Sequence, residues 1–340
     1  MSTDHEWTHK RTGLLGAAAP RSQDGLRMIE RSVLRFQAES LAAIELPCIV
    51  GRGLLDGPRV TLLGGIHGCE YSSIAAVIRF MQGLDTRELR GSITAVPIVN
   101  ISSFRARVPF VVPEDGKNLN RCFPGSYDGT FSDALARAVF DELIAPSDIL
   151  LDLHGGDQTE ALQPFALYDE SAVEDRARAL ALALHLPYVV RSAHADAPIS
   201  GTTSSAAAAV GVPAVIAEAG GCGLLEESAV AVLLAGLANA LRHLEMLPGD
   251  PLPPNPSMRS VARFVWLRTR TEGWWESAVR AGEEVSASAL LGVVRDLYGE
   301  VVEEVVAPEA GVVLFLTTSP AVAADGLLLG LGAGLEAIHH

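Results

Sequence analysis

Residues 59–81 read RVTLLGGIHGCEYSSIAAVIRFM, and this stretch decides the fold class. The apolar run Arg59–Leu63 predicts a strand, and the segment from about Glu70 to Met81 has the apolar spacing of a helix. A Gly-Gly pair lies directly after the strand, where the chain must turn. A strand followed at once by a helix is typical of a parallel sheet covered by helices.

The same alternation continues along the chain. Further strands are predicted at Ser92–Val99, Asp148–Leu153 and Pro213–Ala217, and further helices at Ala172–Leu184 and Glu227–Leu244. The sequence therefore predicts an α/β fold with a mostly parallel, mixed sheet that has helices on both faces.

The pattern changes after Leu247. Residues 248–257, PGDPLPPNPS, form a proline-rich segment, and chains commonly change domain in such segments. Beyond it, short β-branched runs between glycines predict a small sandwich or half-barrel. These runs are Val261–Arg268, Val293–Leu297, Val301–Val306 and Gly311–Leu316. We expect an α/β domain over residues 1–250 and a smaller β-rich domain over residues 257–340.

Composition excludes several classes of function. The formal net charge of −15 argues against a nucleic-acid partner, because phosphate backbones are held mainly by lysine and arginine. The apolar runs are too short or too interrupted to predict a membrane span. The first residues, MSTDHEWTHKR, contain no signal-peptide pattern, and four cysteines do not predict a disulfide scaffold. A cytoplasmic location is expected, and a homo-oligomer is left open.

Ionisable residues follow three of the predicted strands. His67 and Glu70 follow the first strand, His154 ends the segment LDLHGG, and Glu218 ends the segment VIAEAGG. Ligands of open α/β sheets bind outside the carboxyl ends of the strands, so these side chains are expected in one crevice. Two imidazoles and one carboxylate form the usual ligand set of a catalytic zinc ion, with Glu218 then available as the general base.

Each of these residues also has a plainer interpretation. The His67–Glu70 pair could be a surface pair on a helix, and His154 could be a half-buried structural histidine. Glu218 could cap a helix near the glycine turn. The occurrence of all four residues after strands favours a functional site. An acidic residue directly after an apolar strand is costly to bury without a partner.

A basic segment lies between the first and second of these motifs. It reads FRARVPFVVPEDGKNLNRCFPG and contains Arg105, Arg107, Lys117 and Arg121 in an otherwise acidic chain. Guanidinium groups bind carboxylates in a bidentate manner, so the segment favours a small substrate that carries a carboxylate. One arginine could instead polarise the scissile carbonyl. The alternative is a solvated loop with scattered charges.

Four motifs together resemble one family. HGCE, NLNRCFPG, DLHGG and EAGG stand in the order and approximate spacing of the succinylglutamate desuccinylase/aspartoacylase family, a branch of the zinc carboxypeptidase-like fold. The resemblance spans roughly Arg59 to Gly221. The NLNRCFPG version is similar to the branch that includes deacetylases of N-acetyl-diaminobutyrate, whereas many members carry aspartate at the position of Asn118.

The resemblance implies a role for each matching residue. It implies one zinc ion per chain held by His67, Glu70 and His154, with Glu218 as the general base. It implies that Asn120 and Arg121 bind the substrate carboxylate. It also implies an upstream arginine that polarises the carbonyl. Arg107 is the choice here, although Arg105 would share its face on an extended segment.

The predicted function is therefore a zinc-dependent amidohydrolase that removes the acyl group from a small N-acyl amino acid. The alternatives are a metallocarboxypeptidase that acts on peptides and a silent small-molecule binding protein of the same fold. Asp152 lies two residues before His154, so on a strand both side chains point the same way. Asp152 is thus either a hydrogen-bond partner of a ligand or a buried structural acid. We expect Cys69, Cys122 and Cys222 to be apolar fillers rather than ligands.

Overall fold

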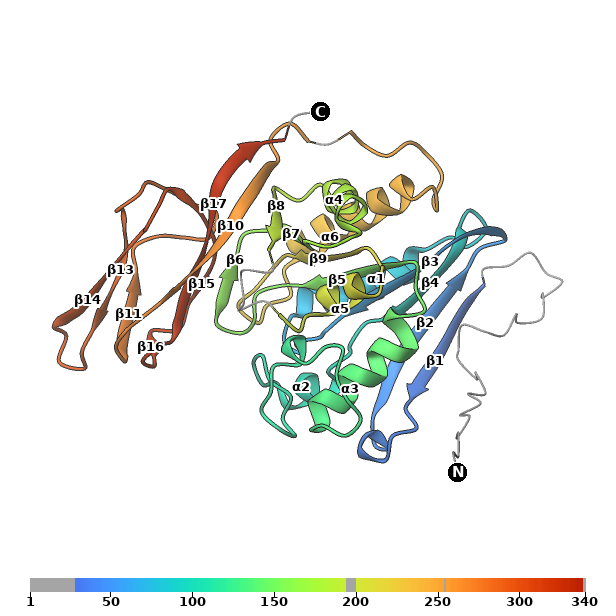
Figure 1. The fold of residues 1–340 in the computed structure, drawn as a ribbon, viewed down its shortest axis with the longest axis horizontal. Coiled ribbons are helices and arrows are strands. Elements are labelled where there is room, and N and C mark those ends of the chain that lie inside the picture. The colour runs from blue at the N-terminus through green and yellow to red at the C-terminus, as the bar shows by residue number, and fades with distance from the viewer. Residues whose placement is uncertain (1–27, 194–199, 254, 339–340) are drawn as a thin grey trace, which may run out of the picture.

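The computed structural model describes residues 28–193, 200–253 and 255–338 (Figure 1). The strands are β1 (Ile29–Arg35), β2 (Glu45–Arg52), β3 (Leu55–Gly64), β4 (Arg90–Val96), β5 (Ile149–His154), β6 (Glu160–Leu162), β7 (Phe165–Asp169), β8 (Tyr188–Ser192), β9 (Ala214–Glu218), β10 (Arg259–Arg268), β11 (Gly273–Ser277), β12 (Glu284–Val285), β13 (Leu290–Arg295), β14 (Val301–Val306), β15 (Gly311–Thr317), β16 (Ala321–Val322) and β17 (Leu327–Ala337). The helices are α1 (Tyr71–Gly83), α2 (Ile101–Ala106), α3 (Phe131–Val139), α4 (Glu174–Ala183), α5 (Thr203–Ala209) and α6 (Glu227–His243), with short turns of helix at η1 (Glu39–Leu41), η2 (Leu119–Arg121) and η3 (Phe140–Ile144).

One large mixed sheet organises the described chain. Its main order is β1-β2-β4-β3-β5-β9-β7-β8-β10-β17-β15-β12, and β6 joins it beside β15. The central strands β4-β3-β5-β9 are parallel to one another. On either side, β2 pairs antiparallel with β4 and β7 pairs antiparallel with β9. The sheet is thus mixed, with the parallel part where the ligand-bearing strands lie. The predicted α/β class is confirmed.

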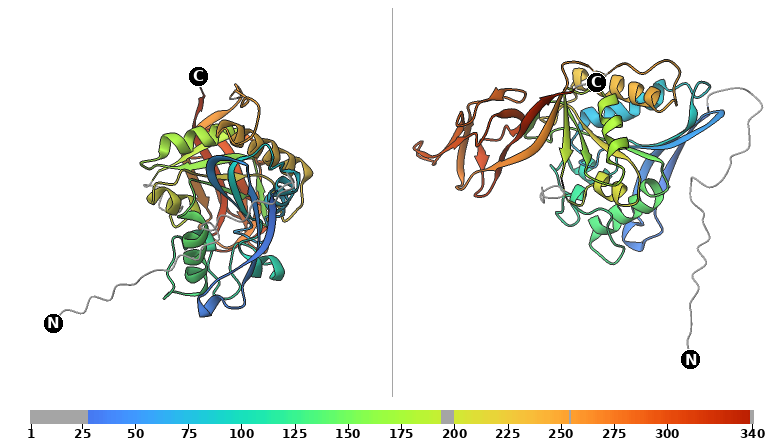
Figure 2. Two further views of the ribbon diagram at one scale, coloured as in Figure 1. Left: turned by 90° about the vertical axis from the view of Figure 1, so that its right-hand side faces the viewer. Right: turned by 45° about the horizontal axis from the view of Figure 1, so that its top comes forward.

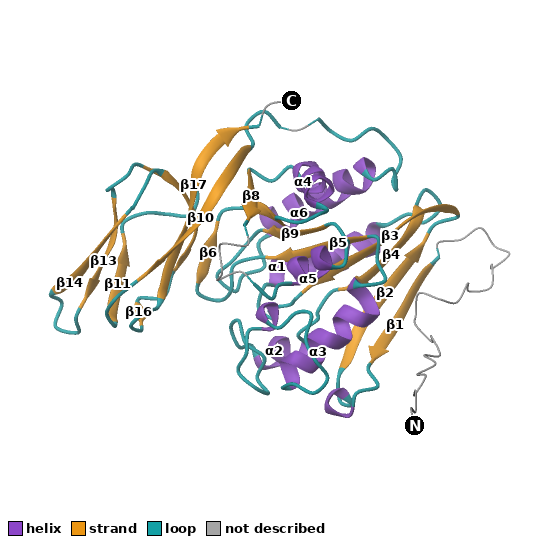
Figure 3. Ribbon diagram, in the orientation of Figure 1, coloured by secondary structure: helices purple, strands orange, loops and turns teal. Residues whose placement is uncertain are grey.

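Helices cover both faces of the sheet because its central strands are apolar on both faces. In Figure 3, α4 and α6 lie above the strands and α2 and α3 lie below them. Leu62 packs into the core under α1, α4 and α6, whereas the next residue, Leu63, packs into the core under α3 and α5. In the same way, Leu151 packs into the first of these cores and Leu150 into the second. Successive side chains on a strand alternate between faces, so both cores grow from the same strands.

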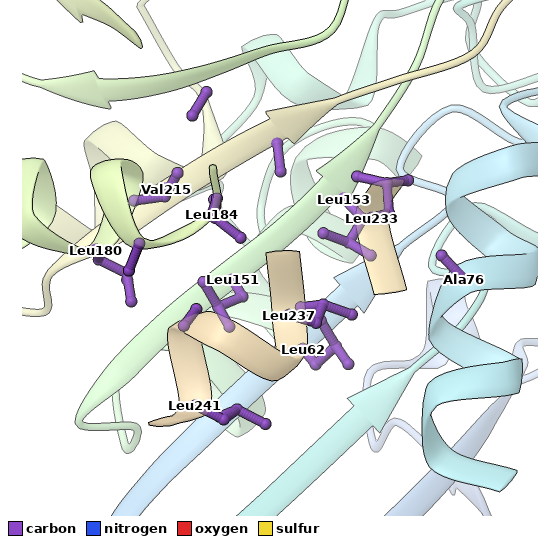
Figure 4. Close-up of a cluster of buried hydrophobic side chains, with 14 of the residues drawn as sticks. Leu62, Ala76, Leu151, Leu153, Leu180, Leu184, Val215, Leu233, Leu237 and Leu241 are labelled. Atoms are coloured by element: carbon purple, nitrogen blue, oxygen red, sulfur yellow. The ribbon is translucent and has the colours of Figure 1, made fainter. Parts of the chain in front are cut away.

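The first of these cores contains the larger helices. Leu233, Leu237 and Leu241 of α6 project onto Leu62 and Leu151 of the sheet (Figure 4). Each of these leucines is at most 1% exposed, and full burial of one leucine contributes about 1.5 to 3 kcal/mol. This packing fixes β3 and β5 relative to each other, and with them the histidines that follow.

The C-terminal region is β-rich, as predicted, and it continues the main sheet. β10 pairs in parallel with β8 and antiparallel with β17, and a second sheet of order β14-β13-β11-β16 lies beyond it. The right-hand view of Figure 2 shows these strands extending away from the α/β part. Trp275, Leu291 and Leu331 contribute to the core of this region. The boundary near residues 250–257 stays a prediction.

The predicted elements match the structure to within a few residues. The strand predicted at Ser92–Val99 ends at Val96, because Pro97 follows and has no N–H for a strand hydrogen bond. Among the described residues, no helix is both long enough and apolar enough to cross a membrane. The N-terminal residues that lack a signal-peptide pattern lie outside the described part.

Candidate active site

Three of the predicted site residues meet at the carboxyl ends of the parallel strands. His67 lies in the turn after β3, Glu70 is the residue before α1, and His154 ends β5. One potential ligand atom from each side chain lies within 4.8 Å of the others. All three side chains are buried. The structure therefore brings together the predicted ligand set.

The turn between His67 and Glu70 is shaped by the packing of α2. A Cβ atom at Gly68 would lie 2.1 Å from the backbone nitrogen of Phe104, so only glycine allows α2 to approach the turn. The turn then directs the two side chains to the same point, with His67 Nδ1 2.6 Å from Glu70 Oε1. His154 Nδ1 lies 3.1 Å from Glu70 Oε2. Both histidines thus present Nδ1 to one carboxylate.

The other nitrogen of each ring faces an oxygen acceptor. His67 Nε2 lies 3.0 Å from Asn118 Oδ1, and that atom also accepts a hydrogen bond from the backbone N–H of Asn120. The backbone donor identifies the Asn118 atom as oxygen, so His67 must donate from Nε2. His154 Nε2 lies 3.0 Å from Asp152 Oδ2. With Nε2 as the donor to Asn118, Nδ1 is the ring nitrogen of His67 that faces Glu70, as in a metal-ligating histidine.

Two further observations fit a cation between these atoms. Glu70 Oε2 is buried and makes no hydrogen bond of good geometry, although His154 Nδ1 is near. Burial alone would raise the pKa of Glu70, but His67 and His154 outweigh it and lower the pKa to about 2. Burial likewise lowers the pKa of His154, but Asp152 and Glu70 raise it well above its usual value. A metal ion can replace the proton that His154 otherwise holds on Nδ1.

Glu218 lies beside His154. It ends β9, and in the parallel β5–β9 pair His154 is its register partner. Glu218 is half-buried, and burial raises its pKa well above the usual value, with Glu70 and Glu160 adding to the rise and His154 opposing it. A carboxyl group with a raised pKa suits proton transfer near neutral pH. Glu218 thus lies beside His154, and its role as the general base stays a prediction.

Asn120 and Arg121 lie in η2, which follows the hydrogen-bonded Asn118. Asn120 is buried, and its Oδ1 accepts a hydrogen bond of 3.0 Å from the backbone N–H of Thr203. This bond leaves the Asn120 amide nitrogen as a donor. The guanidinium of Arg121 donates to the Asn120 carbonyl at 2.7 Å and forms no ion pair with any described residue. Burial lowers the pKa of Arg121, while nearby Glu218 raises it.

The structure corrects one expectation about the upstream arginines. Arg105 and Arg107 do not share a face of an extended segment, because residues 101–106 form α2. Asn100 starts this helix by accepting a hydrogen bond from the N–H of Ser103. Arg107 follows the helix in the left-handed conformation, at φ 57°. Its carbonyl accepts a hydrogen bond of 2.7 Å from Gln158 in the loop after His154. The main chain of Arg107 thus contacts the loop that follows His154, whereas Arg105 lies in the last turn of α2.

Several residues of the site carry no role in the sequence prediction. Asn118 holds His67, and Thr203 donates its hydroxyl to Asp152, which in turn accepts from His154. Asp157 is buried and accepts from the backbone N–H of Phe110. The position of Asn118 in the NLNR motif is the only sequence signal among these. The others become visible only when α5 and the loop after β5 are placed in space.

The fold and the site define an α/β protein with a candidate metal centre at the carboxyl ends of its parallel strands. The profile of the succinylglutamate desuccinylase/aspartoacylase catalytic domain matches residues 56–244. The chain is 30% identical over 262 residues to the N-alpha-acetyl-L-2,4-diaminobutyric acid deacetylase of Halomonas elongata, covering 75% of each chain. The chain belongs to the succinylglutamate desuccinylase/aspartoacylase family.

Solved structures agree with this assignment. The product-bound ectoine utilization protein EutE (DoeB) of Ruegeria pomeroyi is similar, with a TM-score of 0.78 and 26% identity over 89% of this chain and 95% of that one. A succinylglutamate desuccinylase/aspartoacylase of Rhodobacter sphaeroides gives a TM-score of 0.76 and 25% identity, covering 94% of this chain and 99% of that one. The similarity thus extends through the β-rich C-terminal region.

Proposed function

We propose that this protein is a zinc-dependent deacylase that hydrolyses the amide bond of a small N-acyl amino acid. One observation carries the proposal: Nδ1 of His67 and Nδ1 of His154 converge on Glu70, with Glu218 beside His154 in register. The deacetylase from Halomonas elongata supports the reaction class, because its name describes removal of an acetyl group from a diamino acid.

His67, Glu70 and His154 would hold the zinc ion. When bound there, zinc supplies Lewis-acid chemistry, which polarises a carbonyl and lowers the pKa of a coordinated water toward about 7. Glu218 takes a proton from the attacking water and later delivers it to the departing amine nitrogen. Asp152 keeps the His154 imidazole oriented, and Asn118 keeps the His67 imidazole oriented, while negative charge develops on the substrate carbonyl oxygen.

The substrate carboxylate is assigned to Arg121 and Asn120. Arg121 has no acidic partner among the described residues, and the Asn120 amide nitrogen is a free donor once its oxygen has accepted from Thr203. Two donors of this kind match the two oxygens of a carboxylate. Arg107 is proposed to stabilise the negative charge on the carbonyl oxygen during attack, since its main chain contacts Gln158 in the loop after His154.

The direct test of the proposal is a panel of acetyl-, succinyl- and formyl-amino acids beside short peptides, with and without a chelator. We expect chelator-sensitive release of the amine from at least one acylated amino acid and little cleavage of the peptides. Cleavage of peptides alone would favour the metallocarboxypeptidase. A zinc-loaded protein that cleaves nothing in the panel would favour the binding protein.

Arg121→Ala is expected to raise KM for carboxylate-bearing substrates by about 10-fold to 100-fold, because a charged hydrogen bond contributes about 1.5 to 3 kcal/mol. The measurement compares an acylated amino acid with its carboxamide derivative, in which the negative charge is removed. The variant should lose most of the preference for the acid over the amide. An unchanged preference would contradict the assignment of Arg121.

A further inference from the structure

Thr203 is a buried residue that contacts two parts of the site at once. It is the first residue of α5 and is 0% exposed. Its hydroxyl donates a hydrogen bond of 2.5 Å to Asp152 Oδ2, and that oxygen lies 3.0 Å from Nε2 of His154. Its backbone N–H donates a hydrogen bond of 3.0 Å to Asn120 Oδ1. One residue thus holds both a neighbour of the candidate metal centre and a residue proposed to bind the substrate carboxylate.

The position of Thr203 is fixed by the packing of α5. Ala206 and Ala207 lie one turn further along the helix and belong to the same buried core as Leu150 of β5. Residues three or four positions apart share a face of a helix, and alternate residues share a face of a strand. The face of α5 that packs toward Leu150 therefore presents Thr203 to Asp152, which lies two residues further along β5.

The chain before α5 is fixed against the residues proposed to bind the carboxylate. Gly201 has a left-handed φ of 79°, and a Cβ atom there would lie 2.5 Å from the carbonyl oxygen of Arg121. The carbonyl of Gly201 accepts a hydrogen bond of 3.0 Å from the N–H of Phe123. Because glycine allows this close approach, the start of α5 and the η2 segment hold each other in place.

Asp152 depends on the hydroxyl of Thr203 for its orientation. The Asp152 side chain is buried, and its Oδ2 faces both Thr203 and His154. Its other oxygen, Oδ1, is buried and has no hydrogen-bond partner within the described part of the chain. Without the hydroxyl, the carboxylate would be held by the histidine alone and could turn away from it. Such a turn would release the imidazole that Asp152 orients.

We propose that Thr203 is a positioning residue that aligns the metal ligand His154, through Asp152, with the amide group of Asn120. This inference rests on the proposed deacylase function and adds a residue to it. The hydroxyl of Thr203 acts on the metal centre, and its N–H acts on the residue that binds the substrate carboxylate. The two actions can therefore be separated by substitution.

Thr203→Val removes the hydroxyl but keeps the branched shape and the N–H. The zinc affinity of the metal-free protein, measured by competition with a chromophoric chelator, should fall by about 3-fold to 10-fold, as expected for one lost hydrogen bond. Thr203→Ser keeps the hydroxyl and should bind zinc with close to native affinity. Equal zinc affinity in Thr203→Val and the native protein would overturn the proposal.

A double-mutant cycle with Asp152→Asn tests whether the effect passes through Asp152. In the Asp152→Asn background, Thr203→Val should change zinc affinity by no more than about 2-fold. The matched control is Thr202→Val, because the hydroxyl of Thr202 caps the same helix by accepting from the N–H of Ser205. This control should keep near-native zinc affinity. Fully additive losses in the cycle, or an equal loss in Thr202→Val, would contradict the role of the Thr203 hydroxyl.

Thr203→Pro removes the N–H together with the hydroxyl. Proline is favoured at the first position of a helix, and Thr202 has the extended conformation that a residue before proline prefers, at φ −81° and ψ 162°. At saturating zinc, Thr203→Pro should raise KM for an acylated amino acid by about 3-fold to 10-fold relative to Thr203→Val. The reason is that Asn120 loses the donor that holds its oxygen. Equal KM values in the two variants would contradict the role of the N–H.

The zinc and kinetic measurements separate this inference from the proposed function. Hydrolysis by the native protein, together with native zinc affinity in Thr203→Val, would overturn the role of Thr203 and leave the deacylase intact. Weaker zinc binding in Thr203→Val, together with no hydrolysis of any acylated amino acid by the native protein, would support the role of the hydroxyl and count against the deacylase.

Discussion

Replacing Glu218 by glutamine is expected to leave the metal centre in place and to lower turnover by about 100-fold to 10,000-fold, the usual contribution of a general acid–base group. Glutamine keeps the shape of the side chain but cannot accept a proton from water. Glu218 is not among the three side chains that converge on one point, so zinc content should not change. The loss should appear in kcat much more than in KM.

The measurement is steady-state kinetics with an acylated amino acid, together with zinc quantification of the same preparation. Glu226→Gln is the control, because Glu226 precedes α6 just beyond the same glycine turn and lies outside the ligand cluster. It should retain close to native kcat. A Glu218→Gln protein with near-native turnover would refute the assigned base.

Replacing His154 by glutamine is expected to have the largest effect on the metal. His154 supplies one of three ligand atoms, and glutamine cannot present a ring nitrogen to Glu70. Zinc affinity and activity should fall together. Asp152→Asn removes only the acceptor on the far side of the ring, and loss of such a partner typically costs about 10-fold to 100-fold in metal affinity or activity. The loss in His154→Gln should exceed the loss in Asp152→Asn.

Thermal unfolding of the metal-free proteins controls for damage to the fold. Both replacements keep side-chain volume nearly unchanged, so the metal-free variants should unfold cooperatively, as the metal-free native protein does. Equal zinc affinity in His154→Gln and the native protein would contradict the ligand assignment.

Local sequence predicts the centre of the fold well because the central strands are apolar and each passes into a turn. His67, Glu70, His154 and Glu218 were predictable for the same reason: each lies within a few residues of such a strand end. The carboxyl ends of parallel strands meet at one edge, so order along the chain becomes proximity in space.

Features that depend on distant contacts were not predictable in this way. The end of α2 decides where Arg105 and Arg107 lie, and this end depends on the capping by Asn100 and on the packing of the helix against Gly68. The position of Glu160 depends on two glycine turns, at Gly156 and Gly221, that follow different strands. The pairing of β10 with β8, which extends the main sheet into the C-terminal region, also joins segments that are far apart in the sequence.

The most direct test of the central account is a titration of zinc into the metal-free native protein, with release of amine from an acylated amino acid as the readout. We predict no hydrolysis without metal and a linear rise in the rate that breaks at one zinc ion per chain. His154→Gln should show no such rise at the same zinc concentrations. Hydrolysis by the metal-free protein, or the same break in His154→Gln, would contradict it.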